Sequence, residues 1–318
     1  MAKKAEKLPK IVITHPLTAR VVAEELRPHA RVVLARTRPA ILRELRDADG
    51  LVTLLTVKVD RELLSAAPRL RAVGNVAVGL DNIDLTACAA RRIPVVNTPD
   101  VLTRATAELT LALLLAAARR IPEGERVARS GRWKGWDPDQ LHGLDLKGRV
   151  AVIVGPGRIG KETGRLLRAL GLKVEFIARG EPESSLRSKL RRAQILSIHA
   201  PLSPSTRHWL SAPRLALLPR DAIVLNTSRG PLVDERALVK ALKARRIFAA
   251  GLDVYEDEPR IPADLRALRN TVLLPHLGSS TRETREAMAR AAASGVVALL
   301  AGRRPWNLVK TLGRRAPR

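Results

Sequence analysis

The sequence predicts an α/β protein with two domains, each built around a parallel β-sheet. Three observations support this prediction. Short apolar runs alternate with segments of helical period, which is the pattern of βαβ units in parallel sheets. The alternation occurs in two separate series along the 318 residues, a length that suits two ordinary domains. Hydrophobic residues make up 46% of the chain, enough for a sizeable core in each.

The first series of apolar runs lies in the N-terminal part of the chain. Its expected strands cover residues 10–14, 30–35 and 50–55. Residues 18–26 and 39–45 have the helical spacing expected between parallel strands. These runs are mostly apolar, so we expect buried strands.

A second series of apolar runs begins near residue 148. Its six expected strands cover residues 148–154, 172–178, 193–200, 221–228, 249–255 and 271–276. The segments GKETGRLLRALG and DERALVKALKARR fill two of the gaps with helical period. We therefore expect a second parallel sheet.

The region between the two series should carry the chain from one domain to the other, with the break and a connecting helix near residues 97–108. The apolar run 109–118 is too short to span a bilayer and is expected as a buried helix. Residues 130–148 are rich in Gly, Trp, Asp and Pro, which predicts a loop or arm.

The composition excludes several kinds of partner. The formal charge is +26, from 57 Lys and Arg against 31 Asp and Glu, but the basic residues are spread along the chain. Aromatic residues are 2%, too few for a base-stacking platform, so we expect no specific nucleic-acid partner. The single cysteine, Cys88, allows no intrachain disulfide and suits a reducing compartment. The N-terminal residues show no apolar signal segment, and we expect a cytoplasmic protein with no membrane partner.

A glycine pattern in the second series indicates dinucleotide binding. The sequence GPGRIG (155–160) directly follows an expected strand and opens an expected helix. Glycines let the backbone turn tightly and approach a pyrophosphate, which the first N–H groups of the helix then bind. Pro156 has no N–H, so Arg158 and Ile159 are the expected donors. The residues assigned to this site are Gly155, Gly157, Arg158, Ile159 and Gly160.

The end of the next expected strand bears on the choice of cofactor. Ala178 stands where an acidic residue would bind the ribose 2′-hydroxyl of NAD, and Arg179 follows it. An arginine without the acid favours a 2′-phosphate, so NADP is preferred over NAD. The alternative is that Arg179 is one more solvated cation in a basic chain.

Three polar residues lie at the carboxyl ends of expected strands of the second sheet: Arg229 and Glu258 follow their strands, and His276 ends its own. A lone histidine such as His276 is usually an ordinary loop residue. However, ligands of open parallel sheets bind beyond the carboxyl ends of the strands, and all three residues belong to that edge. We therefore expect them to share one site.

These residue types suit hydride transfer to a 2-oxo acid. The resulting alkoxide must be protonated, and His276 can supply a proton near neutral pH. The carboxylate of Glu258 would favour the imidazolium and hold its orientation. The guanidinium of Arg229 would hold the substrate carboxylate and carbonyl. No histidine or cysteine cluster has metal-ligand spacing, so no metal is expected.

With these residues identified, the chain resembles the D-isomer-specific 2-hydroxyacid dehydrogenases, particularly the glyoxylate/hydroxypyruvate reductase branch. The matching motifs follow in order along nearly the whole chain: GNVAVGLDNID, TRATAELTLALLL, VGPGRIG, LSIHAPLSPSTRH, NTSRGPLVDE, AGLDVYEDEP and PHLGSST. The spacings of 29 residues from Arg229 to Glu258 and 18 from Glu258 to His276 also fit. The resemblance implies an NAD(P)-dependent enzyme that reduces glyoxylate or hydroxypyruvate to the 2-hydroxy acid.

The resemblance also implies further site residues. The backbone amides of Ala77, Val78 and Gly79 should bind the substrate carboxylate, and Leu54 or Leu55 should line the substrate pocket. Asp253 should bond the nicotinamide carboxamide. The other residues expected near the cofactor are Thr106, Pro201, Thr206, Thr227 and Gly278. Without the resemblance, Asp253 would equally be a helix cap, Thr106 a buried hydroxyl and residues 76–79 plain strand.

The resemblance further implies two Rossmann-like parallel-sheet domains with an active-site cleft between them. Residues 1–98 and 284–318 would form the substrate-binding domain, and residues 99–283 the dinucleotide-binding domain. Family members are usually homodimers, and Trp133 and Trp136 in the expected arm are candidates for that contact or for packing within one subunit. Pro156 departs from the family pattern, which has an apolar residue there.

Other functions remain open. A 3-phosphoglycerate dehydrogenase-type enzyme would suit the basic surface, although the chain leaves no room for a regulatory domain. A non-catalytic, dinucleotide-sensing module of the corepressor kind would share the fold and the motifs, and a basic RNA-associated protein with a vestigial site is a third possibility. The intact set of Arg229, Glu258 and His276 argues for turnover.

Overall fold

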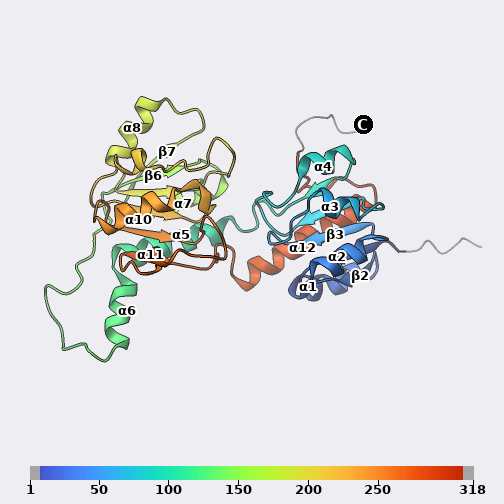
Figure 1. Ribbon diagram of the computed structural model, residues 1–318, viewed down its shortest axis with the longest axis horizontal. Helices are drawn as coiled ribbons and strands as arrows, with labels where there is room; N and C mark the ends of the chain where they lie inside the picture. The colour runs from blue at the N-terminus through green and yellow to red at the C-terminus, as the bar shows by residue number, and fades with distance from the viewer. Residues whose placement is uncertain (1–7, 311–318) are drawn as a thin grey trace, which may run out of the picture. The chain divides into compact units, whose positions relative to one another are not determined.

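The computed structural model describes residues 8–310, and the chain divides into two compact units (Figure 1). Unit 1 comprises Met1–Leu102 with Thr281–Arg318, and unit 2 comprises Thr103–Ser280. The boundaries expected from the sequence fall at 98/99 and 283/284. Each unit holds one sheet whose strand pairs are all parallel, so the predicted α/β class is confirmed.

Unit 1 contains a five-stranded sheet in the order β2-β1-β3-β4-β5. Its strands are β1 (Lys10–Ile13), β2 (Arg31–Leu34), β3 (Gly50–Thr53), β4 (Ala72–Asn75) and β5 (Val95–Val96). Its helices are α1 (Pro16–Leu26), α2 (Arg38–Leu45), α3 (Arg61–Ser65), α4 (Leu85–Ala90) and α12 (Arg282–Leu300). Helices α2, α3 and α4 share one core cluster with the sheet, while α1 and α12 pack together on the strands. Cys88 of α4 is buried in that core, and burial raises the pKa of its thiol to about 11.

Helix α12 returns the chain to unit 1 after unit 2 is complete. Its Val296 lies directly over β3 and β4, where a Cβ on Gly50 would come within 2.9 Å and one on Gly74 within 2.8 Å. The Asn307 amide then donates to the carbonyls of Asn97 and Ala291, at 2.8 and 2.9 Å. The C-terminal segment is therefore an integral part of this unit's core.

Unit 2 contains a six-stranded sheet in the order β11-β10-β9-β8-β6-β7. Its strands are β6 (Val150–Val154), β7 (Lys173–Ile177), β8 (Ile195–Ile198), β9 (Ile223–Asn226), β10 (Ala249–Leu252) and β11 (Thr271–Leu273). Its helices are α5 (Thr103–Ala118), α6 (Ile121–Arg129), α7 (Arg158–Ala169), α8 (Glu183–Arg192), α9 (Ala212–Leu215), η1 (Gly230–Leu232), α10 (Glu235–Lys243) and α11 (Ala263–Arg266). Helices α5 and α7 belong to the core cluster on one face of the sheet, and α8 and α10 to the cluster on the other.

Side-chain caps fix the starts of several helices at the sheet edges. Asp60, Asp84 and Asp234 each accept a hydrogen bond from the backbone N–H three residues on, at 3.0, 2.8 and 3.0 Å. These caps end the preceding loops at defined residues. The Asp234 cap matters most for the site, because α10 begins just after the loop that carries Arg229.

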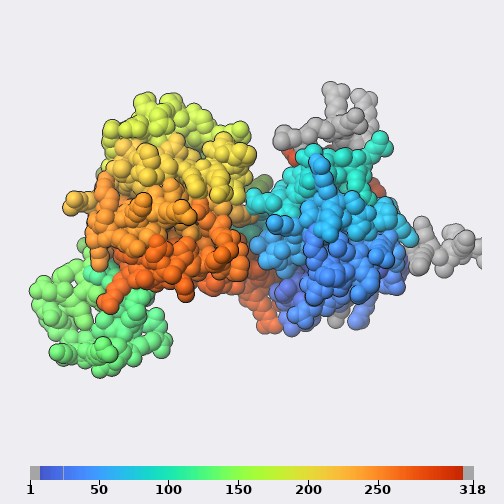
Figure 2. All heavy atoms as spheres, in the orientation of Figure 1, coloured from blue at the N-terminus to red at the C-terminus, as the bar shows by residue number. Residues whose placement is uncertain are grey.

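Residues 130–148 form the irregular arm that the composition predicts. With α6, this arm stands away from the body of unit 2, as the green segment of Figure 2 shows. No residue of α6 is buried, and Ile121, Trp133 and Trp136 are 53%, 58% and 84% exposed. The arm thus displays large apolar side chains to its surroundings.

Candidate active site

The carboxyl edge of the unit 2 sheet brings two of the three expected catalytic residues into direct contact. Nδ1 of His276, in the loop after β11, lies 2.8 Å from Oε2 of Glu258, in the loop after β10. Both side chains are about one-third exposed, at 31% and 32%. Because Glu258 occupies Nδ1, the Nε2 side of the ring is left for a second proton partner.

The third residue, Arg229, acts on this pair through its charge. Arg229 follows β9 and is half-buried. Burial alone would raise the pKa of Glu258, but the hydrogen bond and charge of His276, the amide of Tyr255 and the charge of Arg229 together lower it. Glu258 is therefore held as a carboxylate beside the imidazole.

The loop of His276 is fixed by Asp253, at the end of β10. The backbone N–H of His276 donates to the Asp253 carbonyl at 2.9 Å, and the N–H groups of Leu277 and Gly278 donate to its two carboxylate oxygens at 2.6 and 2.8 Å. Asp253 is fully buried; burial raises its pKa, while the two amides and the charge of His276 oppose that effect. These bonds hold His276 in the left-handed region, at φ 56°, which a residue with a Cβ rarely adopts. This anchoring role escapes sequence reasoning, which treats Asp253 only as a ligand for the cofactor or a helix cap.

Two of the threonines expected near the cofactor use their hydroxyls inside unit 2. The Thr106 hydroxyl donates to the Gly278 carbonyl at 3.0 Å, and Thr106 is only 4% exposed. The Thr227 hydroxyl lies 2.9 Å from the Thr110 hydroxyl, and Thr227 is 8% exposed. Thr106 therefore provides a second anchor for the loop of His276.

A glycine lets the loop of Arg229 pack against the loop of Glu258. A Cβ on Gly230 would lie 1.8 Å from the carbonyl carbon of Tyr255 and 2.4 Å from the amide nitrogen of Glu256. Tyr255 in turn donates its N–H to Glu258 Oε1 at 3.1 Å and its hydroxyl to the Leu274 carbonyl at 2.9 Å. Backbone contact thus couples the positions of the two loops.

The glycine-rich loop has the form expected of a pyrophosphate site. Gly155 has φ 93°, and a Cβ there would lie 2.7 Å from the His199 carbonyl oxygen. Gly157 is the N-cap of α7 and has open space where a Cβ would project. Arg158, Ile159 and Gly160 form the first turn of α7, whose N–H groups have no acceptor within the helix. These features fit a dinucleotide cofactor bound at the start of α7.

The residues expected around the adenosine and the nicotinamide lie at the same edge. Arg179 is exposed directly after β7, and the carboxylate nearest to it in sequence, Glu181, is paired with Lys189 at 2.6 Å. Thr206 closes the loop after β8, because its hydroxyl donates to the Pro201 carbonyl and accepts from Ser203 N–H, both at 2.8 Å.

In unit 1, the expected substrate residues Ala77, Val78 and Gly79 lie in the loop after β4, where residues 76–78 form a bend. Their carbonyls accept hydrogen bonds from Thr98 N–H, Asn97 Nδ2 and Asn75 Nδ2, at 3.0, 2.9 and 2.9 Å. Within residues 8–310, their own N–H groups have no hydrogen-bond acceptor. An array of such amides suits an anion.

The second expected substrate loop lies beside this bend within unit 1. Asn82 donates to the Leu54 carbonyl at 3.1 Å and pairs with Asn75 at 3.1 Å. Leu55 follows β3 and is 37% exposed. One asparagine pair therefore holds both loops at the carboxyl edge of the unit 1 sheet.

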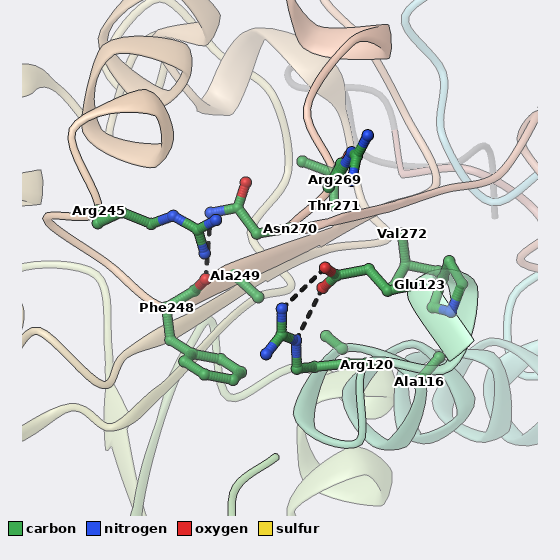
Figure 3. Close-up of a pocket in the computed structure, with 12 residues that line it drawn as sticks. Ala116, Arg120, Glu123, Arg245, Phe248, Ala249, Arg269, Asn270, Thr271 and Val272 are labelled. Atoms are coloured by element: carbon green, nitrogen blue, oxygen red, sulfur yellow. Dashed lines mark hydrogen bonds and ion pairs between the residues drawn. The ribbon is translucent and has the colours of Figure 1, made fainter. Parts of the chain in front are cut away.

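A pocket at the opposite edge of the unit 2 sheet contains none of the expected site residues. Figure 3 shows it beside Ala249 and Thr271, the first residues of β10 and β11, with the Arg120–Glu123 ion pair on one side. It therefore belongs to the amino ends of the strands, whereas Glu258 and His276 follow the carboxyl ends. The candidate active site is therefore at the carboxyl edge of the sheet and does not include this pocket.

Across the part of the chain that the structure describes, no group of three or more histidine, cysteine, aspartate or glutamate side chains could hold a metal ion. Over the same residues, no helix is both long and apolar enough to cross a bilayer.

Comparison with known proteins yields consistent matches. The family profile described as D-isomer specific 2-hydroxyacid dehydrogenase, NAD binding domain, matches residues 111–278. The glyoxylate reductase of Thermococcus litoralis is 44% identical over 289 residues, which cover 86% of this chain and 87% of that protein. The glyoxylate reductase of Aeropyrum pernix is 46% identical over 284 residues, with 85% of each chain covered.

Solved structures give the same result. The NADPH-dependent glyoxylate/hydroxypyruvate reductase of Sinorhizobium meliloti, in complex with NADP and malonate, superposes with a TM-score of 0.86 at 34% identity and covers 97% of this chain and 99% of that one. A D-isomer specific 2-hydroxyacid dehydrogenase from Polaromonas, described as putative, has a TM-score of 0.87 at 35% identity and covers 95% and 100%.

Proposed function

The chain belongs to the D-isomer specific 2-hydroxyacid dehydrogenase family, and we propose that it reduces a small 2-oxo acid, glyoxylate or hydroxypyruvate, with NADPH. The observation that carries this proposal is the contact of 2.8 Å between His276 Nδ1 and Glu258 Oε2, in the electrostatic range of Arg229. The names of the relatives from Thermococcus litoralis and Sinorhizobium meliloti support the choice of substrate.

A nicotinamide dinucleotide held at the start of α7 would supply a hydride to the carbonyl carbon of the substrate. His276 donates a proton from Nε2 to the carbonyl oxygen, so that the C–O bond ends as a hydroxyl. Glu258 stabilises the imidazolium before transfer and orients the ring. Arg229 holds the substrate carboxylate and polarises the carbonyl. The amides of Ala77, Val78 and Gly79 are the proposed partners of the same carboxylate.

Unit 2 is the proposed dinucleotide-binding domain, and unit 1 the proposed substrate-binding domain. The first turn of α7 would receive the pyrophosphate. Arg179 would bind the 2′-phosphate of NADP, because no acid occupies the end of β7 and Glu181 is already paired with Lys189. Ala178 at the end of β7 leaves NAD without its usual ribose acceptor.

The proposed oligomer is a homodimer formed through the arm of unit 2. Exposed aromatic side chains such as Trp133 and Trp136 are typical of protein interfaces. Light scattering should give the mass of two chains, and changing both tryptophans to serine should give the mass of one. A parent protein with the mass of one chain would refute the proposed homodimer. The single cysteine allows no intrachain disulfide, which supports the proposed cytoplasmic location.

The decisive test is NADPH oxidation with glyoxylate, hydroxypyruvate and phosphorylated hydroxypyruvate, each repeated with NADH. The proposal predicts turnover of glyoxylate or hydroxypyruvate, faster with NADPH. The variant His276→Ala is the control, which should keep cofactor binding but lose at least about 10²-fold in rate. Turnover of the phosphorylated acid alone would indicate a 3-phosphoglycerate dehydrogenase-type enzyme, and cofactor binding without turnover would indicate a sensing module.

A further inference from the structure

The backbone of the loop that carries Glu258 is hydrogen-bonded to a second carboxylate, that of Glu235. Glu235 is the first residue of α10, and its Oε1 accepts a hydrogen bond of 2.7 Å from the backbone N–H of Glu256. Glu235 is only 6% exposed. Glu256 stands two residues before Glu258, so this bond fixes the backbone next to the acid–base pair.

A buried carboxylate in this position is costly for the fold. Burial raises the pKa of Glu235, and the nearby charges of Glu256, Asp264 and Asp257 raise it further, while the Glu256 amide opposes them. Within residues 8–310, Glu235 forms no ion pair with a basic side chain. An apolar or amide side chain would avoid much of this cost. Among the described residues, the Glu256 amide donates a hydrogen bond to this carboxylate, which also lies in the first turn of α10, where a negative charge is favoured.

The side chain of Glu256 is also fixed, by His208. Nε2 of His208 pairs with Oε1 of Glu256, and the backbone N–H of His208 donates to the Pro231 carbonyl at 2.7 Å. Pro231 belongs to η1, directly after the loop of Arg229. The loops of Arg229 and Glu258 are therefore joined by a polar chain as well as by the packing of Gly230.

From Glu256 the chain of contacts leads to the proton donor. Tyr255 N–H donates to Glu258 Oε1 at 3.1 Å, and Glu258 Oε2 meets His276 Nδ1 at 2.8 Å. If the Glu256 amide is released, the turn from Tyr255 to Glu258 keeps the pairing of Glu256 with His208 and the packing on Gly230, but it loses its backbone hydrogen bond to Glu235. The turn that holds Glu258 against His276 then has more freedom to move.

We propose that Glu235 is a positioning residue of the acid–base pair: its carboxylate holds the Glu256 amide and thereby keeps Glu258 against His276. This inference rests on the proposed function, in which His276 donates the proton. Glu235 touches neither that proton nor the substrate. It acts through the geometry of the loop.

The test compares Glu235→Ala with Glu235→Gln and with Asp60→Ala in the full-length protein. Glu235→Ala should lower kcat about 10-fold, leave KM for NADPH unchanged, and move the pH profile of kcat toward that of Glu258→Gln. Glu235→Gln keeps an oxygen acceptor and should restore both kcat and the profile. Asp60→Ala removes the cap of α3 in unit 1, so it should lower Tm without moving the profile.

Hydrogen–deuterium exchange of the peptide spanning residues 254–259 gives a readout that does not need turnover. Exchange there should speed up in Glu235→Ala and remain at the parent rate in Glu235→Gln and Asp60→Ala. An unchanged exchange rate in Glu235→Ala, or an equal rise in Asp60→Ala, would overturn the proposal. An inactive parent protein with faster exchange in Glu235→Ala would instead contradict the proposed function and leave the loop anchor standing.

Discussion

Replacing Gly230 with alanine should disable the acid–base pair without touching it. A Cβ at this position would lie 1.8 Å from the carbonyl carbon of Tyr255. Carbon atoms in contact are about 3.5 Å or more apart, so the two backbones must separate by about 1.7 Å. Since the N–H of Tyr255 holds Glu258 Oε1, the separation moves Glu258 away from His276. A misplacement of about 1 Å can cost roughly 10²-fold in rate, so kcat should fall by at least that factor.

The assay follows NADPH oxidation with glyoxylate, together with thermal unfolding of the same preparations. Overpacking of this kind costs roughly 1–3 kcal/mol, so Tm should also fall. The matched control is Gly124→Ala in α6, where the nearest heavy atom to the new Cβ is 3.9 Å away. That variant should keep the parent kcat and gain up to about 1 kcal/mol of stability from helix propensity. A folded Gly230→Ala enzyme with the parent kcat would refute the proposed coupling between the two loops.

Three further predictions test other parts of the site. Glu258→Gln removes the charge beside His276, so the pH above which reduction slows should fall, and an unmoved pH profile would show that the carboxylate does not act on the ring. Arg179→Asp should reverse the preference from NADPH to NADH, measured as the ratio of kcat/KM, and an unchanged ratio would mean that the 2′-phosphate is bound elsewhere. Burial lowers the pKa of His199 to about 4 from 6.5, so the folded state favours the neutral ring and loses stability as pH falls from about 6.5 toward 4, by at most about 3 kcal/mol. Urea unfolding at both ends of that range should show this loss in the parent and not in His199→Gln, whereas equal losses in both would contradict it.

Much of the unit 2 sheet is predictable because its signals are local. The six expected strands of the second series all form, each shorter than its apolar run at one or both ends. The glycine pattern opens α7 as expected, because tight turns and helix starts depend on a few adjacent residues. The positions of Arg229, Glu258 and His276 after their strands follow from the same alternation.

Unit 1 shows where the local signals weaken. The alternation does not mark β4 and β5 as strands, because Ala72–Asn75 includes a glycine and Val95–Val96 is only two residues long. Both strands exist because neighbouring backbones supply their hydrogen bonds. The same is true of the site: the contacts of Asp253 with the His276 loop, and of Glu235 with Glu256, join residues more than 20 positions apart. No periodicity in the sequence encodes such pairs.

The split of unit 1 along the chain also has a consequence for biosynthesis. The sheet of this unit is translated early, but α12, which packs over β3 and β4, leaves the ribosome only after all of unit 2. Unit 2 occupies one continuous segment, so it can fold before α12 has been synthesised and has packed on the sheet of unit 1. A transcript that stops before codon 282 would therefore yield a finished unit 2 joined to a sheet whose strands β3 and β4 lack their covering helix, a product that proteases should remove quickly.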